Sequence, residues 1–132
     1  MRRLDQLFEA AKAAQAHAYA PYSSFPVGAA LLTTSGRIFA GCNVENAAYP
    51  VGTCAEAGAI SAMVAAGEQR ISQILIIGNG PELVTPCGAC RQRIREFSGP
   101  ETPIHIAGVD GIRAGFTLSE LLPHAFGPDN LE

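Results

Sequence analysis

The stretch VGAALLTTSGRIFAGCNV, residues 27–44, contains two apolar runs separated by the dipeptide Ser35-Gly36. The first run, residues 27–34, has the length and composition of a buried strand, and residues 37–44 have those of a second. Ser-Gly between two such runs is a turn signal, so the stretch predicts a β-hairpin. The fold therefore includes a sheet that is at least partly antiparallel.

A helical pattern precedes the hairpin and a loop follows it. Residues 4–18 place leucine, phenylalanine and alanine at helical spacing, and Pro21 ends that segment. Residues 46–52 show neither helical nor strand periodicity and contain Pro50 and Gly52. We therefore expect a helix before the hairpin and an irregular connection after it.

A second helix is predicted to begin at Thr53. Threonine is a good N-cap residue, and Glu56 three positions later would complete a capping box. The pattern continues to about residue 66, and Gly67 then supplies a helix stop.

Strands and helices alternate through the rest of the chain. The predicted elements are a strand at 72–77, a loop at 78–86, a helix from Cys87 to the stop at Ser98-Gly99-Pro100, strands at 102–107 and 112–116, and a helix at 117–122 capped by Thr117. Together with the hairpin, this order predicts an α/β sandwich with a mixed sheet. A length of 132 residues predicts one domain, spanning 1–132.

Composition and charge exclude several classes of protein. Hydrophobic residues make up 48% of the chain and charged residues 16%, which excludes a disordered protein. The net charge is −3 and no basic run occurs, so we expect no nucleic-acid partner. The longest apolar run, residues 74–77, is far too short for a bilayer, and no signal-peptide core is present. We expect a cytoplasmic protein without a membrane partner.

The four cysteines indicate a metal site or catalysis. Cytoplasmic proteins seldom form disulfides, so clustered cysteines in such a chain serve other chemistry. Cys87 and Cys90 form a C-x-x-C motif, whose two sulfurs can converge on one ion, although redox sites share the spacing. Cys54 stands at the predicted start of the second helix, and Cys42 lies near a strand end.

Cys54, Cys87 and Cys90 together favour a catalytic zinc site. Both predicted helix starts should lie at one edge of the sheet, where α/β proteins place their sites. Three thiolates would leave the fourth tetrahedral position of Zn²⁺ open to water, and helix N-termini favour the thiolate form. Glu56, two residues after Cys54, is near enough to act as a general acid and base without binding the metal. Cys54-Ala55-Glu56 followed by PCGAC (86–90) resembles the signature of the zinc deaminases, which is a histidine or cysteine, then x-E, then P-C-x-x-C.

Two other interpretations of the cysteines are weaker. A redox or structural C-x-x-C with an unrelated Cys54 leaves Glu56 unexplained. A closed four-thiolate site that adds Cys42 leaves no open position for chemistry, and a buried thiol explains Cys42 more simply. The three histidines show no spacing that suggests ligation: His17, His105 and His124.

A resemblance to a known family extends beyond the cysteines. The segments PYSSFPVGAAL (21–31), GCNVENAAY (41–49), CAE (54–56), PCGACRQ (86–92) and LLPHAFGP (121–128) resemble the cytidine deaminases of the cytidine/deoxycytidylate deaminase family. The resemblance implies a three-layer α-β-α sandwich with a five-stranded mixed sheet, and the length resembles the small homotetrameric branch. It also implies hydrolytic deamination of cytidine and 2′-deoxycytidine to uridine and 2′-deoxyuridine plus ammonia, in pyrimidine salvage.

The resemblance implies roles for individual residues. Cys54, Cys87 and Cys90 would hold one Zn²⁺ per subunit, a zinc-bound hydroxide would be the nucleophile, and Glu56 would shuttle protons. The residues implied in substrate binding are Phe25, Asn43, Glu45, Ala55 and Phe126, with Asn43 and Glu45 on the ribose 3′-hydroxyl. In the tetrameric relatives, positions matching Ala47, Tyr49 and Phe126 approach a neighbouring subunit's site.

One departure from the family pattern bears on the metal. Many members with three cysteine ligands carry arginine directly after the catalytic glutamate, whereas this chain has Ala57. Three thiolates and a hydroxide exceed the zinc charge by two negative units, and without that arginine the zinc should be a weaker Lewis acid. We hypothesise that Arg91, near the start of the third helix, or the two helix dipoles compensate. Two alternatives to the main function are deamination of a modified or antibiotic nucleoside and a zinc-stabilised scaffold without activity.

Overall fold

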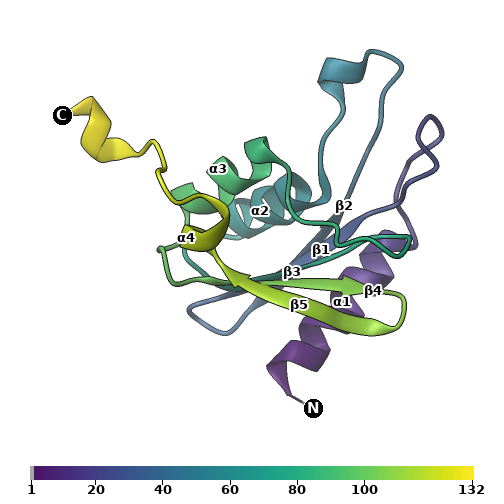
Figure 1. The fold of residues 1–132 in the computed structure, drawn as a ribbon, viewed down its shortest axis with the longest axis horizontal. Helices are drawn as coiled ribbons and strands as arrows, with labels where there is room; N and C mark the ends of the chain where they lie inside the picture. The colour runs from purple at the N-terminus through teal and green to yellow at the C-terminus, as the bar shows by residue number, and fades with distance from the viewer. Residues whose placement is uncertain (1) are drawn as a thin grey trace.

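The five strands form one mixed sheet. The structure is a computed structural model that describes residues 2–132, and its strands lie in the order β2-β1-β3-β4-β5 (Figure 1). β3 and β4 run parallel, whereas the other three pairs are antiparallel. The five-stranded mixed sheet is therefore confirmed. The strand bounds are β1 Gly28–Thr33, β2 Ile38–Cys42, β3 Ile71–Ile77, β4 Pro103–Gly108 and β5 Gly111–Thr117.

Helices cover both faces of the sheet, which gives the expected three layers (Figure 1). Leu75 and Ile77 of β3 pack toward one face, and Ile74 and Ile76 pack toward the other, because successive side chains of a strand point to opposite sides. The helices are α1 Arg3–Gln15, on the first face, and α2 Ala55–Ala65, α3 Gly88–Glu96 and α4 Leu118–Leu121, on the second. Within residues 2–132, none of these helices has the length and apolar composition needed to cross a membrane.

Three predicted turns and caps are confirmed. Gly36 in the hairpin turn has φ 93° and Gly67 after α2 has φ 89°, a left-handed backbone that favours glycine. Thr117 caps α4, because its hydroxyl accepts a hydrogen bond from the Glu120 amide at 3.3 Å. The Glu120 carboxylate in turn accepts one from the Thr117 amide at 2.8 Å.

The end of α1 differs from the prediction. The helix ends at Gln15 rather than near residue 18. The Ala18 amide donates to the Gln15 carbonyl at 3.1 Å, so the chain after the helix tightens into a turn with bonds three residues back. The next residue, Tyr19, then forms an isolated bridge with Val44, beyond the end of β2. This bridge ties the loop before β1 to the loop after β2.

The start of α2 also differs, and the predicted capping box of Thr53 and Glu56 is wrong. α2 begins at Ala55 and its N-cap is Cys54, which makes no side-chain capping hydrogen bond. Thr53 instead pairs through its backbone with Val44, with N···O distances of 2.9 and 3.0 Å. Because this extended pairing holds Thr53 outside the helix, Glu56 does not fold back to cap it. The loop before Thr53 contains a 3₁₀ turn, Tyr49–Val51.

Close packing at Gly41 sets the distance between α2 and the sheet. A Cβ atom at Gly41 would lie 2.7 Å from the Ala55 carbonyl oxygen and would also collide with the Ala59 amide nitrogen. Both neighbours are helix backbone, which cannot move aside as a flexible side chain can. A glycine in β2 therefore lets α2 approach closely, and this approach sets the position of the residues at its N-terminus.

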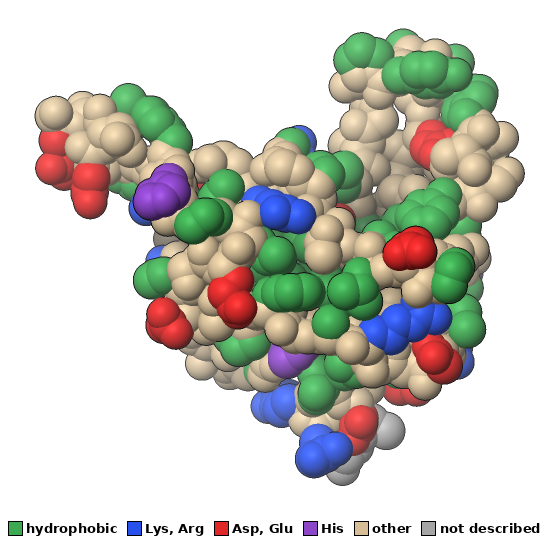
Figure 2. Space-filling model, in the orientation of Figure 1, with side chains coloured by type: hydrophobic (Ala, Val, Ile, Leu, Met, Phe, Trp, Pro, Cys, Tyr) green, Lys and Arg blue, Asp and Glu red, His purple; other side chains and the backbone are tan. Residues whose placement is uncertain are grey.

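The loop between β2 and α2 and the C-terminal segment after α4 project from the body of the molecule (Figures 1 and 2). The C-terminal segment ends in a 3₁₀ turn, Pro128–Leu131. Both carry large apolar side chains that are exposed in the single chain: Tyr49, Val51, Phe126 and Leu131. Exposed apolar side chains on a projecting segment are typical of a surface that a partner covers.

Candidate metal centre

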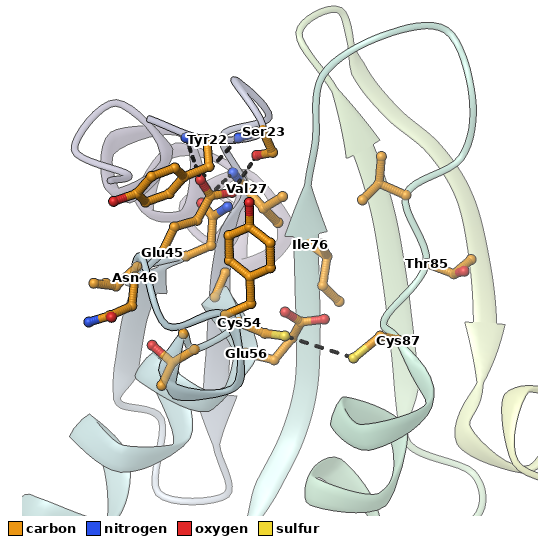
Figure 3. A pocket seen from close by; sticks show the side chains of 17 residues that line it. Tyr22, Ser23, Val27, Glu45, Asn46, Cys54, Glu56, Ile76, Thr85 and Cys87 are labelled. Atoms are coloured by element: carbon orange, nitrogen blue, oxygen red, sulfur yellow. Dashed lines mark hydrogen bonds between the residues drawn. The ribbon is translucent and has the colours of Figure 1, made fainter. Parts of the chain in front are cut away.

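Three cysteines from two helix starts meet at one point. The sulfurs of Cys54, Cys87 and Cys90 all lie within 4.8 Å of one another. Cys54 is the N-cap of α2 and Cys87 the N-cap of α3, while Cys90 lies one turn into α3 and is fully buried. Figure 3 shows the Cys54 and Cys87 sulfurs side by side at the base of a pocket, 3.8 Å apart. The predicted cluster is therefore present, and Cys42 is not part of it.

The donor set fits zinc. Tetrahedral zinc with Zn–S bonds of about 2.3 Å requires sulfurs about 3.8 Å apart. The Cys54–Cys87 distance of 3.8 Å has that value, and the third sulfur lies within the same cluster. Three soft thiolates favour zinc over magnesium or calcium, which prefer oxygen ligands. Cys54, Cys87 and Cys90 would therefore hold the ion.

The protein environment alone does not favour three thiolates. Burial raises the pKa of Cys54 and of Cys90, and the neighbouring charge of Glu56 raises the pKa of both further. Burial also acts to raise the pKa of Cys87, but hydrogen bonds from the Cys90 and Ala89 amides and from the Cys54 and Cys90 thiols outweigh it, and the pKa of Cys87 falls. A cation among the sulfurs would offset this clustering of negative charge.

Glu56 is a buried carboxyl group beside the cluster. It lies in the first turn of α2, is only 4% exposed, and faces the same pocket as Cys54 and Cys87 (Figure 3). Burial raises the pKa of Glu56, while the Arg93 charge and a hydrogen bond from Cys90 partly oppose that effect. A carboxyl group whose pKa is raised toward neutrality can both accept and return a proton, which general acid–base chemistry requires.

A pocket of about 530 Å³ opens above the cluster, a size that suits a small-molecule ligand. Its walls come from the loops before β1 and after β2, the start of α2, β3 and the loop before α3. The lining residues are Tyr22, Ser23, Val27, Asn43, Val44, Glu45, Asn46, Tyr49, Gly52, Thr53, Cys54, Ala55, Glu56, Ile76, Val84, Thr85 and Cys87. Of the residues predicted to bind substrate, Asn43, Glu45 and Ala55 are among them, as is Tyr49, which was predicted to approach a neighbouring subunit's site.

Asn43 holds the loop before β1 as well as lining the pocket. Its side-chain oxygen accepts a hydrogen bond from the Val27 amide at 2.9 Å, and its side-chain nitrogen donates to the Phe25 carbonyl at 2.9 Å. An amide group has two donor hydrogens and two acceptor lone pairs, so each end keeps one further bond available.

Glu45, in the loop after β2, binds the turn at Tyr22 and Ser23 in the loop before β1. Its carboxylate accepts hydrogen bonds from the Tyr22 amide at 2.9 Å, the Ser23 amide at 3.1 Å and the Ser23 hydroxyl (Figure 3). The Ser23 hydroxyl bond is the main cause that lowers the pKa of Glu45. The adjacent Ser24 has φ 56°, an uncommon value for a residue other than glycine. The carboxylate therefore remains ionised while it fixes a strained turn at the wall of the pocket.

Several predicted residues lie outside the pocket of this single chain. Phe25 and Ala47 are absent from its lining. Phe126 is 57% exposed on the C-terminal projection, where its carbonyl accepts a hydrogen bond from Gln92. Tyr49 lines the mouth of the pocket, and its ring meets that of Tyr22 edge to face at 6.1 Å.

Sequence reasoning assigned no role to several residues of the pocket wall. Tyr22 and Ser23 lie within a segment that carried the family resemblance, and that segment was the available signal. Val84 and Thr85 lie in a loop without periodicity, so no pattern marked them.

The structure shows the hydrogen-bond partners of Arg91, the residue that we hypothesised to compensate for the missing arginine. The Arg91 guanidinium donates to the Pro86 carbonyl at 2.7 Å, the Leu121 carbonyl at 2.9 Å and the Thr85 hydroxyl at 3.2 Å. Arg91 thus anchors the backbone just before Cys87 instead of contacting a thiol. The arginine that does contact a sulfur is Arg93, which donates to Cys90.

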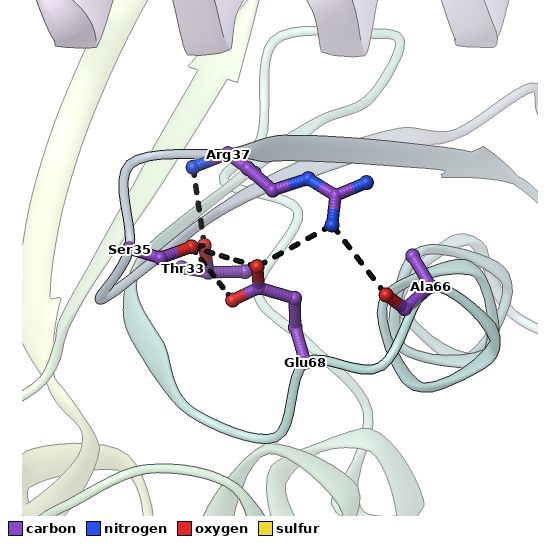
Figure 4. A network of polar contacts seen from close by, with 5 residues as sticks. All are labelled: Thr33, Ser35, Arg37, Ala66 and Glu68. Carbon is purple, nitrogen blue, oxygen red and sulfur yellow. Dashed lines mark hydrogen bonds and ion pairs between the residues drawn. The ribbon is translucent and has the colours of Figure 1, made fainter.

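A second network of serine and carboxylate lies at the other end of β1 and α2 (Figure 4). The Ser35 hydroxyl lies 2.7 and 2.8 Å from the two Glu68 carboxylate oxygens, and Arg37 pairs with Glu68 at 3.5 Å. Arg37 also donates to the Ala66 carbonyl at 3.4 Å. The Ser35 bond is the main cause that lowers the pKa of Glu68. This network joins the hairpin turn to the end of α2, far from the pocket.

Comparisons with known proteins agree with the site. The family model described as the cytidine and deoxycytidylate deaminase zinc-binding region matches residues 1–106. The cytidine deaminase of Sporosarcina psychrophila is 40% identical over 128 residues, which cover 97% of this chain and 94% of that protein. The cytidine deaminase of Mycobacterium tuberculosis H37Rv is 41% identical over 118 residues, which cover 89% and 85%.

Solved structures agree as well. The crystal structure of cytidine deaminase from Burkholderia pseudomallei has a TM-score of 0.87 and 43% identity, covering 96% of this chain and 100% of that one. The structure from Mycobacterium tuberculosis has a TM-score of 0.81 and 38% identity, covering 96% and 99%. Fold and site together define a zinc-binding enzyme domain built on a three-layer α-β-α sandwich. The chain belongs to the cytidine and deoxycytidylate deaminase family.

Proposed function

We propose that the protein catalyses hydrolytic deamination of cytidine and 2′-deoxycytidine to uridine and 2′-deoxyuridine, with release of ammonia. The observation that carries this proposal is the three-cysteine cluster beside the buried carboxyl of Glu56, at the base of a pocket in a member of this family. The relatives named above are cytidine deaminases, which supports cytidine as the substrate. Deamination of this kind belongs to pyrimidine salvage.

Zinc bound by the three cysteines would supply a Lewis acid that makes water nucleophilic at neutral pH. Glu56 takes one proton from the attacking water and gives it to N3 of the pyrimidine, which makes C4 more electrophilic as the water oxygen bonds to it. Glu56 then takes the second proton of that oxygen and passes it to the amine, which leaves as ammonia when its bond to C4 breaks. The burial of Glu56 supports this role, because a raised pKa matches the carboxyl group to both halves of the transfer.

Asn43 and Glu45 bind the ribose 3′-hydroxyl in this proposal. The amide of Asn43 retains one donor hydrogen and one acceptor position beyond its bonds to the loop, and Glu45 retains acceptor capacity as a carboxylate. A hydroxyl group between them could donate to one and accept from the other. Ala55, fully buried at the first position of α2, lines the pocket close to the cluster.

The active form is a homotetramer in this proposal. Tyr49 is 76% exposed, and Phe126 also projects from the single chain, so both are available to a neighbouring copy. Ala47, Tyr49 and Phe126 approach a neighbouring subunit's site in the assembled form, whereas Phe25 lines the pyrimidine pocket in this proposal. Measuring the mass in solution by light scattering tests this point, and a monomer with full activity would contradict it.

Nucleosides rather than nucleotides or polynucleotides are the proposed substrates. The net charge is −3, and the described pocket lining contains carboxylates but no lysine or arginine to bind a phosphate. We further propose that residues 1–132 form a single catalytic domain and that the protein acts in the cytoplasm.

The direct test follows the ultraviolet absorbance of cytidine and of 2′-deoxycytidine with zinc-loaded protein, and measures ammonia in parallel. We expect loss of the cytosine band with one ammonia per pyrimidine converted. Deoxycytidylate serves as a comparison substrate and should react poorly. A protein that holds one zinc per chain and yet converts neither nucleoside would overturn the proposal.

A further inference from the structure

Arg93 is the cationic side chain that contacts the metal cluster. Its Nη1 donates to the Cys90 sulfur at 3.3 Å, and Arg93 lies three residues after Cys90 on α3, which places both on one face of the helix. The Cys90 residue is fully buried, whereas the Arg93 side chain reaches solvent. The guanidinium therefore reaches the buried Cys90 sulfur from the exposed face of α3.

The cluster needs a positive charge from outside. Three thiolates carry three negative charges against the two positive charges of a zinc ion, and the Glu56 carboxyl lies beside them. Arg91 directs its guanidinium hydrogen bonds to three oxygen atoms rather than to a sulfur. The position after Glu56 is Ala57, which carries no charge. Arg93 remains as a cation whose hydrogen bond to a sulfur the structure shows.

We propose that Arg93 is a positioning residue for the metal centre: it orients the Cys90 sulfur and neutralises part of the negative charge of the ligands. The inference rests on the proposed function in that the cysteines hold zinc. Outer partners of metal ligands typically contribute about 10- to 100-fold to metal affinity or to activity. A guanidinium withdraws charge from the sulfur, so the zinc it helps to hold is also a stronger Lewis acid.

The test compares Arg93→Gln, Arg93→Lys and Arg95→Gln in the intact protein. Arg95 is on the same helix, and its guanidinium lies against Gly127 of the C-terminal segment rather than against a sulfur. Arg95→Gln thus removes the same charge from the same helix without touching the cluster. The first measurement is the rate at which zinc passes to a colorimetric chelator at pH 7.5, with no substrate present.

Arg93→Gln should release zinc about 10- to 100-fold faster than the wild-type protein, and Arg95→Gln should match the wild type. Arg93→Lys should lie between them, because lysine keeps the charge but loses the planar donor geometry. In steady-state kinetics, Arg93→Gln should lower kcat while KM stays within about twofold, since no contact with the nucleoside is removed.

Equal zinc release from Arg93→Gln and Arg95→Gln would overturn the inference. The chelator measurement also separates it from the proposed function. If the wild-type protein retains zinc but deaminates nothing, the proposed function fails, and the chelator comparison still decides the role of Arg93. If the wild-type protein binds no zinc, both fail.

Discussion

The sulfur of Cys54 lies 3.8 Å from the sulfur of Cys87, and each residue is the N-cap of a helix. The two helices begin at the same edge of the sheet, so their partly positive N-termini face one point. These partial charges offset only part of the effect of burial, which still raises the pKa of Cys54. Cys54 and Cys87 both line the pocket. The metal centre is therefore a consequence of where α2 and α3 start.

Replacing Cys54 with serine tests this relationship. A serine oxygen is a much poorer zinc ligand than a thiolate, so zinc affinity should fall by more than about 100-fold, beyond the usual effect of an outer partner. Metal analysis of the purified protein measures the loss. Cys42→Ser is the matched control and should keep one zinc per chain, because Cys42 lies outside the cluster. Equal zinc in both variants would contradict the assigned ligand set.

Alanine substitutions at Gly41 and Gly58 test whether the close approach of α2 to β2 requires a glycine at position 41. Gly41→Ala places a methyl group against the α2 backbone and should destabilise the protein by about 1–3 kcal/mol, the usual cost of overpacking. Gly58 lies within α2, and a Cβ there would make ordinary contacts of 3.5 Å or more. Gly58→Ala should therefore be neutral or stabilising by up to about 1 kcal/mol. Thermal unfolding of both variants decides the point, and equal destabilisation would refute it.

Glu45→Gln tests whether the carboxylate that orders the loop also serves the substrate. Glutamine offers one acceptor oxygen where Glu45 uses two, so the bonds to Tyr22 and Ser23 should weaken. We expect KM for cytidine to rise about tenfold, with a smaller change in kcat.

Glu68→Gln is the control for that experiment. Glu68 also accepts hydrogen bonds from a serine, but at the opposite end of α2 from the pocket (Figure 4). It should leave KM unchanged. A similar rise in KM in both variants would mean that loss of a carboxylate acts through general loosening of the fold.

The lowered pKa of Glu68 leads to a prediction of how the free energy of unfolding depends on pH. Its pKa in the folded protein is lowered from 4.5, first by the Ser35 hydroxyl, so the folded state binds fewer protons than the unfolded state in this range. The stabilisation is fully present above pH 4.5 and is lost as pH falls through the lower, folded value. Melting temperatures measured from pH 7 to pH 3 should therefore fall less steeply in Glu68→Gln than in the wild type. Parallel curves for the two proteins would contradict the assignment.

Local patterns predicted much of the fold because the decisive interactions are local. Gly36 and Gly67 were identifiable because their turns require a left-handed backbone, and Thr117 because its cap lies within three residues. Thr53 was assigned wrongly because a bridge to Val44, nine positions away, holds it in an extended conformation. No local pattern contains that information.

In the candidate site, too, the features set by local sequence could be predicted and those set by the packing of the helices could not. Cys54, Cys87 and Cys90 could be predicted because ligand spacing and helix starts are visible in sequence. Arg93 was not singled out from the sequence, since Arg91 follows Cys87 by four residues, Arg93 follows Cys90 by three, and the sequence does not show which of the two contacts a sulfur. The structure shows that Arg93 donates a hydrogen bond to Cys90.

The most direct test of the central claim compares Glu56→Gln with the wild-type protein in zinc content and cytidine turnover. The account predicts one zinc per chain in both, because Glu56 binds no metal, and a loss of at least about 100-fold in kcat in the variant, in line with removal of a positioned proton donor and acceptor. Substantial turnover by a zinc-loaded Glu56→Gln protein would contradict the claim that this buried carboxyl group moves the protons.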